Sequence, residues 1–250
     1  MLTARERMRY ARQILLPQWQ EAAQEQLKRS TVLVVGAGGL GSAVLTYLAV
    51  AGVGRIRIID SDSVDLTNLN RQMLYGDQDV GRKKVDSAKE RLEKLNPDIR
   101  IEPIAEILTE ENALHLVGDN PIVDALDNLP ARLLLNRVSL SRNLPLFHGA
   151  VYGFEGRATT FLPGRTACLR CLYKEVVPGT APVVGVTPGL IGCVQAAEVI
   201  KYVLGIGDLL CNRLLIYDGI SLKFSEVNLR RDPACPDCGS CLGSRQRGTQ

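Results

Sequence analysis

Hydrophobic positions in the first part of the chain fall into short continuous runs separated by longer helical stretches. The run TVLVV at 31–35 is rich in β-branched residues, and such a run is typical of a strand that is covered on both faces. An apolar helix is predicted over about 42–51, and glycines end it before the next strand, RIRIID, at 55–60. These three segments predict one β-α-β unit.

The same alternation of strand and helix continues after this unit. The further segments are an amphipathic helix at 81–96, a strand at 99–104, a helix at 109–117, a strand at 121–126, a helix at 130–143 and a strand at 145–150. Such repeated alternation is the pattern of a parallel sheet with helices on both faces. We therefore predict an α/β fold with a Rossmann-like, doubly wound and mostly parallel sheet.

The pattern changes in the last hundred residues. Short runs with alternating polarity at 157–162, 213–218 and 222–229 predict strands with few helices between them. We expect them to extend one edge of the sheet as antiparallel strands. The apolar segment at about 189–204 contains Glu198 and Lys201, so we interpret it as a buried helix and not as a membrane span. No linker divides the chain, which predicts a single domain over 1–240 and a disordered polar tail over 241–250.

Composition narrows the functional classes. The 250 residues, 46% of them hydrophobic, suffice for a full core. A net charge of +3 and an aromatic content of 5% do not favour nucleic acid as a partner. The charged start, MLTARERMRYARQ, is not typical of a signal peptide, so we expect a cytoplasmic protein. In that reducing compartment, paired cysteines more often bind metal or act in catalysis than form disulfides.

The strongest motif is GAGGLG, which follows the strand at 31–35 and opens a helix. Its glycines, Gly36, Gly38, Gly39 and Gly41, satisfy the G-x-G-x-x-G pattern in the context that the pattern requires. Such a loop lets the backbone approach phosphates at a helix N-terminus. Asp60, at the end of the second strand, can accept hydrogen bonds from ribose hydroxyls. The alternative is a purely structural turn.

Base rates for this fingerprint favour NAD, but the polar segment DSDSVDLTNLNRQ after the second strand does not fit that interpretation. It supplies Asp62 and, with a helix start farther along, candidate phosphate ligands: Asn68, Arg71, Gln72 and Lys84. Any one of these cations could also be solvated surface. Asp127 and Asn128 follow the strand at 121–126, at the sheet edge where ligands bind, and a carboxylate there suggests a magnesium ligand. Nucleotidyl transfer needs cations and a metal, whereas an NAD enzyme needs neither.

Two C-x-x-C pairs, separated by 63 residues, predict a second site. The pairs are Cys168 with Cys171 and Cys235 with Cys238, and four thiolates of this spacing are the ligand set of a structural, tetrahedral zinc site. Such a zinc knuckle would join two distant segments. Two independent redox pairs are the alternative. The remaining cysteines, Cys193, Cys211 and Cys241, are assigned no role.

Several of these motifs occur together, in the same order, in a known family. The segments are RYARQILLP, VLVVGAGGLGS, AGVGRIRIIDSDSVDLTNLNRQ, VGRKKV, LNPDI, DALDN, CLRC and CPDCG. Across about residues 5–240 the chain resembles the ThiF/MoeB/HesA family, bacterial relatives of ubiquitin-activating enzymes, and is most similar in character to the MoeB type.

The resemblance implies an adenylyltransferase. ATP would adenylate the C-terminal Gly-Gly carboxylate of a ubiquitin-like sulfur-carrier protein of the MoaD or ThiS type, and pyrophosphate would leave. A separate sulfur donor protein would then displace AMP, in molybdopterin or thiamine biosynthesis. The resemblance also implies that Arg71 and Lys84 contact phosphates, that Asp127 binds magnesium, and that Arg12 reaches the triphosphate in the other subunit of a homodimer.

One departure from the family limits the mechanism. Members with a catalytic thiol carry it after the first C-x-x-C, and the segment at 172–192 contains no cysteine. We therefore expect adenylation without a covalent enzyme thioester, and a mobile crossover loop in this segment. Two other functions stay open: an NAD(P)-binding oxidoreductase and a non-catalytic nucleotide-binding scaffold. His148, in the strand at 145–150, is interpreted as a structural histidine.

Overall fold

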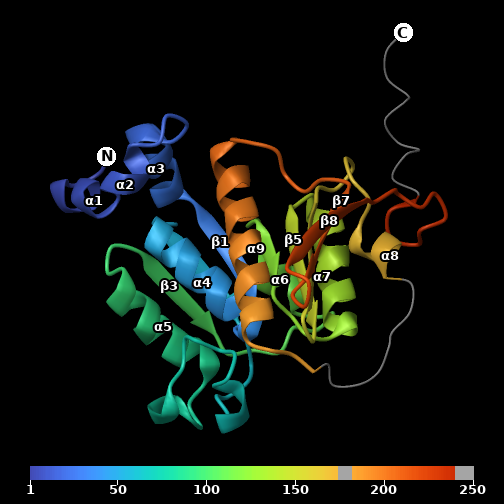
Figure 1. The fold of residues 1–250 in the computed structure, drawn as a ribbon, viewed down its shortest axis with the longest axis horizontal. Coiled ribbons are helices and arrows are strands. Elements are labelled where there is room, and N and C mark those ends of the chain that lie inside the picture. The colour runs from blue at the N-terminus through green and yellow to red at the C-terminus, as the bar shows by residue number, and fades with distance from the viewer. Residues whose placement is uncertain (174–181, 240–250) are drawn as a thin grey trace.

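The computed structural model describes residues 1–173 and 182–239, which form an eight-stranded sheet flanked by helices (Figure 1). The strand order is β3-β2-β1-β4-β5-β6-β7-β8. The strands are β1 (Thr31–Val35), β2 (Arg55–Ile59), β3 (Arg100–Ile104), β4 (Ile122–Asp124), β5 (Leu146–Tyr152), β6 (Glu155–Phe161), β7 (Arg213–Asp218) and β8 (Lys223–Asn228). The first five in this order run parallel, and the last three add antiparallel pairs. The predicted doubly wound sheet with an antiparallel extension is confirmed.

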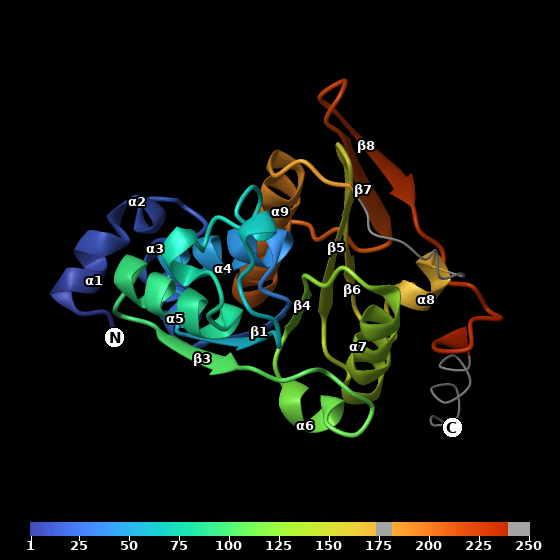
Figure 2. The same ribbon diagram turned by 90° about the horizontal axis from the view of Figure 1, so that it is seen from below.

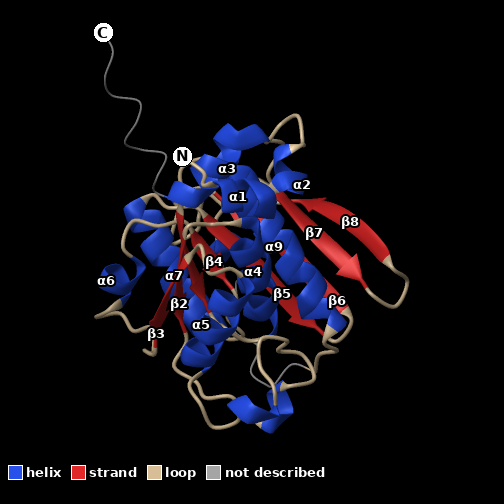
Figure 3. Cartoon of the chain, turned by 90° about the vertical axis from the view of Figure 1, so that its left-hand side faces the viewer, coloured by secondary structure: helices blue, strands red, loops and turns tan. Residues whose placement is uncertain are grey.

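Helices cover both faces of the parallel half (Figure 3). The longer helices are α3 (Gln20–Arg29), α4 (Gly39–Ala51), α5 (Lys84–Leu95), α7 (Leu129–Arg142) and α9 (Val186–Leu204). The shorter ones are α1 (Ala4–Arg9), α2 (Ala11–Ile14), η1 (Leu66–Asn68), η2 (Asp77–Asp79), α6 (Ala113–Val117) and α8 (Leu169–Leu172). Helices α4, α5 and α9 lie on one face, whereas α6 and α7 lie on the other (Figures 1 and 2).

Strand β1 shows why helices must cover both faces of the sheet. Val32 and Val34 belong to the core beneath α4 and α9, whereas Leu33 and Val35 belong to the core beneath α7. All four side chains are almost fully buried. Successive side chains of a strand point to opposite faces, so a continuous apolar run requires a cover on each side.

The predicted buried helix near 189–204 is α9, which begins slightly earlier, at Val186. Its Glu198 is buried and accepts hydrogen bonds from the Thr160 hydroxyl and the Leu210 backbone. The acidic residue is therefore satisfied inside the core, as its burial requires. Across the described ranges, no helix combines the length and the apolar character that spanning a bilayer demands.

Some predicted boundaries differ from the structure. The strand expected at 121–126 is shorter, because β4 ends at Asp124. The helix expected at 109–117 begins only at Ala113. Before it, the Thr109 N–H donates to Oδ1 of Asn112, and the Asn112 N–H donates to Oγ1 of Thr109. Of the mobile crossover loop expected at 172–192, residues 174–181 lie outside the described residues, whereas the part from Val186 on is helical and belongs to α9. The disordered tail expected at 241–250 also lies outside the described residues.

Candidate adenylation site and four-cysteine cluster

The glycine loop turns tightly between β1 and α4. Gly36 has a φ of +99°, and a Cβ built there would lie 2.5 Å from the carbonyl oxygen of Ala125. A Cβ on Gly41 would lie 2.1 Å from the carbonyl oxygen of Gly36. The two positions therefore exclude any side chain, Gly36 also because of its left-handed backbone. The turn leaves the N-terminus of α4 open toward the sheet edge, where an anion is favoured.

Asp60 holds this loop in place. Its Oδ2 accepts a hydrogen bond from the backbone N–H of Ala37 at 2.7 Å, and its Oδ1 accepts one from the N–H of Asp62 at 2.9 Å. Burial raises the pKa of the Asp60 carboxyl, although the Ala37 hydrogen bond and the Lys84 charge act in the opposite direction. Asp60 therefore has a structural role in addition to the ligand role expected of it.

Tyr75 holds the other side of the loop and was not anticipated from the sequence. Its buried hydroxyl donates a hydrogen bond to the carbonyl oxygen of Ala37 at 2.8 Å. Ala37 is thus fixed through both its N–H and its carbonyl group. Nothing local to Tyr75, in the segment MLYGD, distinguishes it from a core aromatic residue.

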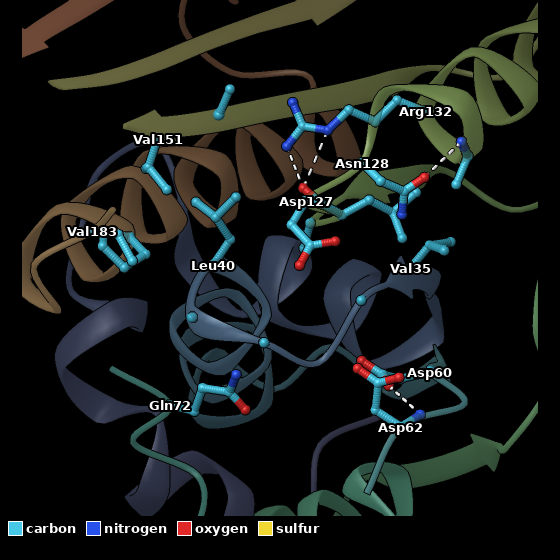
Figure 4. A pocket seen from close by; sticks show the side chains of 18 of the residues that line it. Val35, Leu40, Asp60, Asp62, Gln72, Asp127, Asn128, Arg132, Val151 and Val183 are labelled. Atoms are coloured by element: carbon cyan, nitrogen blue, oxygen red, sulfur yellow. Dashed lines mark hydrogen bonds between the residues drawn. The ribbon is translucent and has the colours of Figure 1, made fainter. Parts of the chain in front are cut away.

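A cavity of about 1150 Å³ opens at the carboxyl ends of the parallel strands. Most of the predicted nucleotide ligands line it: Gly36, Gly38, Gly39, Asp60, Asp62, Arg71, Gln72, Lys84, Asp127 and Asn128. Figure 4 shows Asp60 and Asp62 on one side of this space, with Asp127 and Asn128 on another. The fold therefore brings together segments that are nearly a hundred residues apart.

Lys84 begins α5, and its side chain is almost fully buried. Its Nζ lies 2.8 Å from Oδ2 of Asp62, whose own side chain is 65% exposed. Gln72 is 4% exposed, and its Oε1 has no hydrogen-bond partner among the described residues. An unpartnered buried amide oxygen is costly, so a donor supplied by a ligand would stabilise it.

The strand before Asp127 ends earlier than the sequence suggested. β4 stops at Asp124, so Asp127 and Asn128 belong to the loop between β4 and α7 and not to the strand end. Both are exposed at the cavity. Asn128 also caps α7, because its Oδ1 accepts a hydrogen bond from the N–H of Ala131 at 3.0 Å.

Three predicted site residues do not line the cavity. Asn68 instead accepts a hydrogen bond from the Asp65 N–H within η1, and Gly41 serves the close packing described above. Arg12 is exposed on α2, and no carboxylate of the described residues pairs with it. Its assigned partner would be a second copy of the chain, so a single chain does not test that role.

The structure adds Arg132 to the site. Figure 4 shows Arg132 beside Asp127 and Asn128. From α7, its guanidinium donates to the carbonyl oxygens of Leu126 and Gly149, and it lies 3.7 Å from the Asp124 carboxylate. These contacts fix the loop that carries Asp127. The sequence gives a weak signal for this role, since Arg132 lies inside a predicted helix where an arginine is usually solvated.

The four cysteines of the two C-x-x-C pairs come together at the far end of α7. Their sulfur atoms all lie within 4.8 Å of one another. Three of the separations are 4.0 Å for Cys168–Cys171, 3.7 Å for Cys168–Cys235 and 3.5 Å for Cys171–Cys238. A tetrahedron with metal–sulfur bonds of about 2.3 Å has sulfur–sulfur edges of roughly 3.8 Å. The cluster therefore fits a four-thiolate metal site, and two separate redox pairs do not explain it.

Burial and crowding work against free thiolates at Cys168 and Cys238. At Cys171 burial acts in the same direction, but hydrogen bonds, above all one from the Asp232 backbone N–H, outweigh it and lower the pKa. Burial, with the neighbouring thiols, raises the pKa of Cys168 to about 11 and raises that of Cys238 as well. A bound cation would reverse this effect, because a metal deprotonates the thiols that ligate it. Cys193 and Cys211 are partly buried elsewhere, and Cys241 lies outside the described residues.

Comparison with known proteins agrees with this geometry. A family model described as the ThiF family matches residues 10–237. A protein named SAMP-activating enzyme E1 from Haloferax volcanii is 44% identical over 239 residues, which are 92% of this chain and 88% of that protein. A protein named sulfur carrier protein adenylyltransferase from Thermus thermophilus is 44% identical over 250 residues, which are 95% of this chain and 92% of that protein.

Solved structures give the same result at the level of the fold. The crystal structure of E. coli MccB with MccA-N7isoASN superposes with a TM-score of 0.82 at 27% identity. The match covers 93% of this chain and 74% of the MccB chain.

Proposed function

Because the chain belongs to the ThiF family, we propose that it adenylates the C-terminal carboxylate of a ubiquitin-like sulfur-carrier protein with ATP. The observation that carries the proposal is one cavity lined by the glycine loop, Asp60, Lys84 and Asp127. The chain is an adenylyltransferase, as its relatives are named. The named relatives do not favour an NAD(P)-binding oxidoreductase.

The chemistry needs positioning more than acid or base catalysis. A C-terminal carboxylate is already an anion at neutral pH, and its obstacle is repulsion from the triphosphate. The positive end of α4, with Lys84 and Arg71, would hold the phosphates and offset this charge. A magnesium ion bound at Asp127 would neutralise phosphate charge further. Asp60 would receive the ribose on the other side of the loop.

Carrier docking fits the antiparallel half of the sheet. Apolar side chains are exposed along it, namely Tyr152, Phe154, Ile220, Leu222, Phe224 and Val227. Figure 2 shows the β7–β8 hairpin projecting from the body of the molecule. Exposed apolar patches of this kind mark interaction surfaces. A carrier seated there would present its extended tail to the cavity, which β5 and β6 help to line.

A homodimer completes the proposal. Arg12 would reach the triphosphate bound by the other subunit, and exposed apolar residues near it, Met8, Leu15 and Leu16, suit a contact between copies. The sulfur donor would be a separate protein, since no cysteine follows Cys171 in the segment up to 192. The metal in the four-cysteine cluster would be zinc, held structurally. Cysteines that bind metal instead of forming disulfides fit a cytoplasmic protein.

The decisive experiment is ATP–pyrophosphate exchange with a panel of MoaD- and ThiS-type carriers that end in Gly-Gly. We expect exchange that depends on one carrier, and the responding carrier would separate the molybdopterin pathway from the thiamine pathway. Binding of ATP and carrier without pyrophosphate release would instead support a non-catalytic scaffold. Enhanced nicotinamide fluorescence on titration, with no exchange, would support the oxidoreductase.

A further inference from the structure

Two glutamines fasten the N-terminal helices to the C-terminal end of α4. Nε2 of Gln13, on α2, donates to the carbonyl oxygen of Ala51 at 3.0 Å and to Oε1 of Gln24 at 2.7 Å. Nε2 of Gln24, on α3, donates to the same Ala51 carbonyl at 2.9 Å. The last carbonyl groups of a helix have no partner within that helix. The two glutamines therefore supply donors that α4 cannot supply itself.

A tyrosine and an asparagine make a second connection at the same helix end. Nδ2 of Asn96, which follows α5, donates to the Tyr10 hydroxyl at 2.9 Å and to the carbonyl oxygen of Ala49 at 2.7 Å. Tyr10 and Asn96 are both almost fully buried. A Cβ built on Gly52 would lie 2.7 Å from Tyr10 and from the Gln24 amide, so the contact is close. We call the four side chains Tyr10, Gln13, Gln24 and Asn96 the arm clamp, and residues 4–14, which they hold, the arm.

Arg12 differs from the other arginines of the arm, because it has no ionic partner. The others form ion pairs: Arg5 and Arg9 with Asp98, and Arg7 with Glu21. Arg12 is exposed, and no carboxylate pairs with it in the part of the chain that the structure describes. It lies between Tyr10 and Gln13, so the clamp fixes the backbone on both sides of an uncommitted guanidinium.

The clamp also holds Arg12 far from the cavity of its own chain. The glycine loop leads into the N-terminal end of α4, whereas the clamp binds carbonyl groups at the C-terminal end. α4 has 13 residues, so at 1.5 Å per residue its ends are about 20 Å apart. An arginine side chain is much shorter than this, and Figure 2 shows α1 and α2 at one margin of the molecule. Any triphosphate that Arg12 contacts must therefore be bound by another copy of the chain.

We propose that the arm clamp positions Arg12 for the active site of the partner subunit, so that a change in the clamp lowers the activity of the partner's cavity and not that of its own. Helices as short as α1 and α2, with six and four residues, are not stable without tertiary contacts. The clamp supplies such contacts on both sides of Arg12. This inference rests on the proposed function, because it takes Arg12 as a triphosphate ligand in a homodimer.

Heterodimers separate the contributions of the two subunits. Lys84→Ala in one subunit leaves a single working cavity, in the other subunit, and that cavity is served by the arm of the Lys84→Ala subunit. In the first heterodimer, Gln13→Ala is in the same subunit as Lys84→Ala. In the second, Gln13→Ala is in the subunit with the working cavity. Two affinity tags allow each heterodimer to be purified, and ATP–pyrophosphate exchange is measured with the carrier that gives exchange.

The first heterodimer should have a kcat about fivefold lower than the second, the usual effect of one lost hydrogen bond. The second should match a heterodimer that carries Lys84→Ala alone, because its working cavity is served by an intact arm. A second heterodimer slower than the first would show that Gln13 supports only its own subunit, and would overturn the proposal. Equal rates in the two heterodimers would also overturn it.

A control and a second variant keep this test decisive. Gln26→Ala is the matched control, since Nε2 of Gln26 donates from α3 to the Val203 carbonyl on α9 and not to α4. It should leave exchange unchanged in either arrangement. Tyr10→Phe removes the hydroxyl that accepts from Asn96 and keeps the ring, and we expect the same dependence on the subunit that carries it. If Gln13→Ala does not fold, the Tyr10→Phe heterodimers decide the proposal.

The proposed function and this inference fail in different ways. Absence of exchange by the wild-type protein with every carrier would overturn the proposed function, and this inference with it. Full exchange by a protein that is monomeric in analytical ultracentrifugation would overturn only this inference and the role of Arg12 across subunits. Adenylation of the carrier would still stand.

Discussion

The carboxylate of Asp60 accepts a hydrogen bond from the backbone N–H of Ala37 at 2.7 Å, so the end of β2 holds the glycine loop that follows β1. The same carboxylate is the expected ribose ligand. One residue therefore shapes the loop and faces the nucleotide, and its loss should affect both.

We predict that Asp60→Ala weakens ATP binding by roughly 10- to 150-fold, because a hydrogen bond to a charged group contributes about 1.5–3 kcal/mol. Isothermal titration calorimetry with ATP measures the effect. Asp119→Asn is a suitable control, since Asp119 is an exposed carboxylate before β4 at the opposite end of the strand from the cavity. An unchanged Kd in Asp60→Ala would show that Asp60 has no role in the nucleotide site.

Lys84 and Lys83 are adjacent but have different surroundings. The Lys84 side chain is almost fully buried at the cavity, whereas Lys83 is exposed and its Nζ donates to the Ser61 carbonyl at 2.6 Å. We predict that Lys84→Ala lowers the exchange rate by on the order of 10²-fold or more, because it removes charge that is aimed at the phosphates. Lys83→Ala should stay close to wild type. Equal losses in the two variants would point to a general electrostatic effect.

Asp127→Ala should abolish turnover because it removes the expected magnesium ligand. The variant should bind ATP in the absence of magnesium as well as the wild type does, because only the metal contact is lost. Exchange measured over a range of magnesium concentrations checks this. Full activity at ordinary magnesium would refute the assignment of Asp127 as the metal ligand.

The four-cysteine cluster should hold one zinc ion per chain. Metal analysis of the purified protein measures this, and Cys171→Ser should lose the metal and lower the melting temperature, since a structural zinc site contributes directly to folding. Cys193→Ser should keep both, because Cys193 lies on α9 outside the cluster. Stoichiometry near zero with intact thiols would reject the site.

Stability should depend on pH through His148. Burial lowers its pKa from 6.5, so below about pH 6.5 the unfolded chain binds a proton that the folded chain does not. The free energy of unfolding should therefore fall as the pH falls through this range, by at most about 1.4 kcal/mol per pH unit. Urea denaturation at several pH values measures the slope. His148→Gln should flatten it, whereas the exposed His115→Gln should leave it unchanged.

The sequence predicted the parts of the site that are continuous along the chain. The glycine loop and Asp60 are fixed by one β-α-β unit, and the two cysteine pairs by their spacing. Tyr75 and Arg132 could not be found in this way, because their roles depend on which distant backbone or side-chain group they meet. The end of β4 was placed too late, since the apolar run continues through Ala125 and Leu126 after the strand pairing stops at Asp124.

The four-cysteine cluster joins residues that are synthesised at different times. Cys235 follows Cys168 by 67 positions, so at 5–20 residues per second a ribosome exposes the first thiol pair roughly 3 to 13 seconds before the second. During that interval Cys168 and Cys171 have only half of their ligand set. The nascent chain is therefore most vulnerable to oxidation after its nucleotide-binding half has emerged, and a late zinc-binding step would complete its biogenesis.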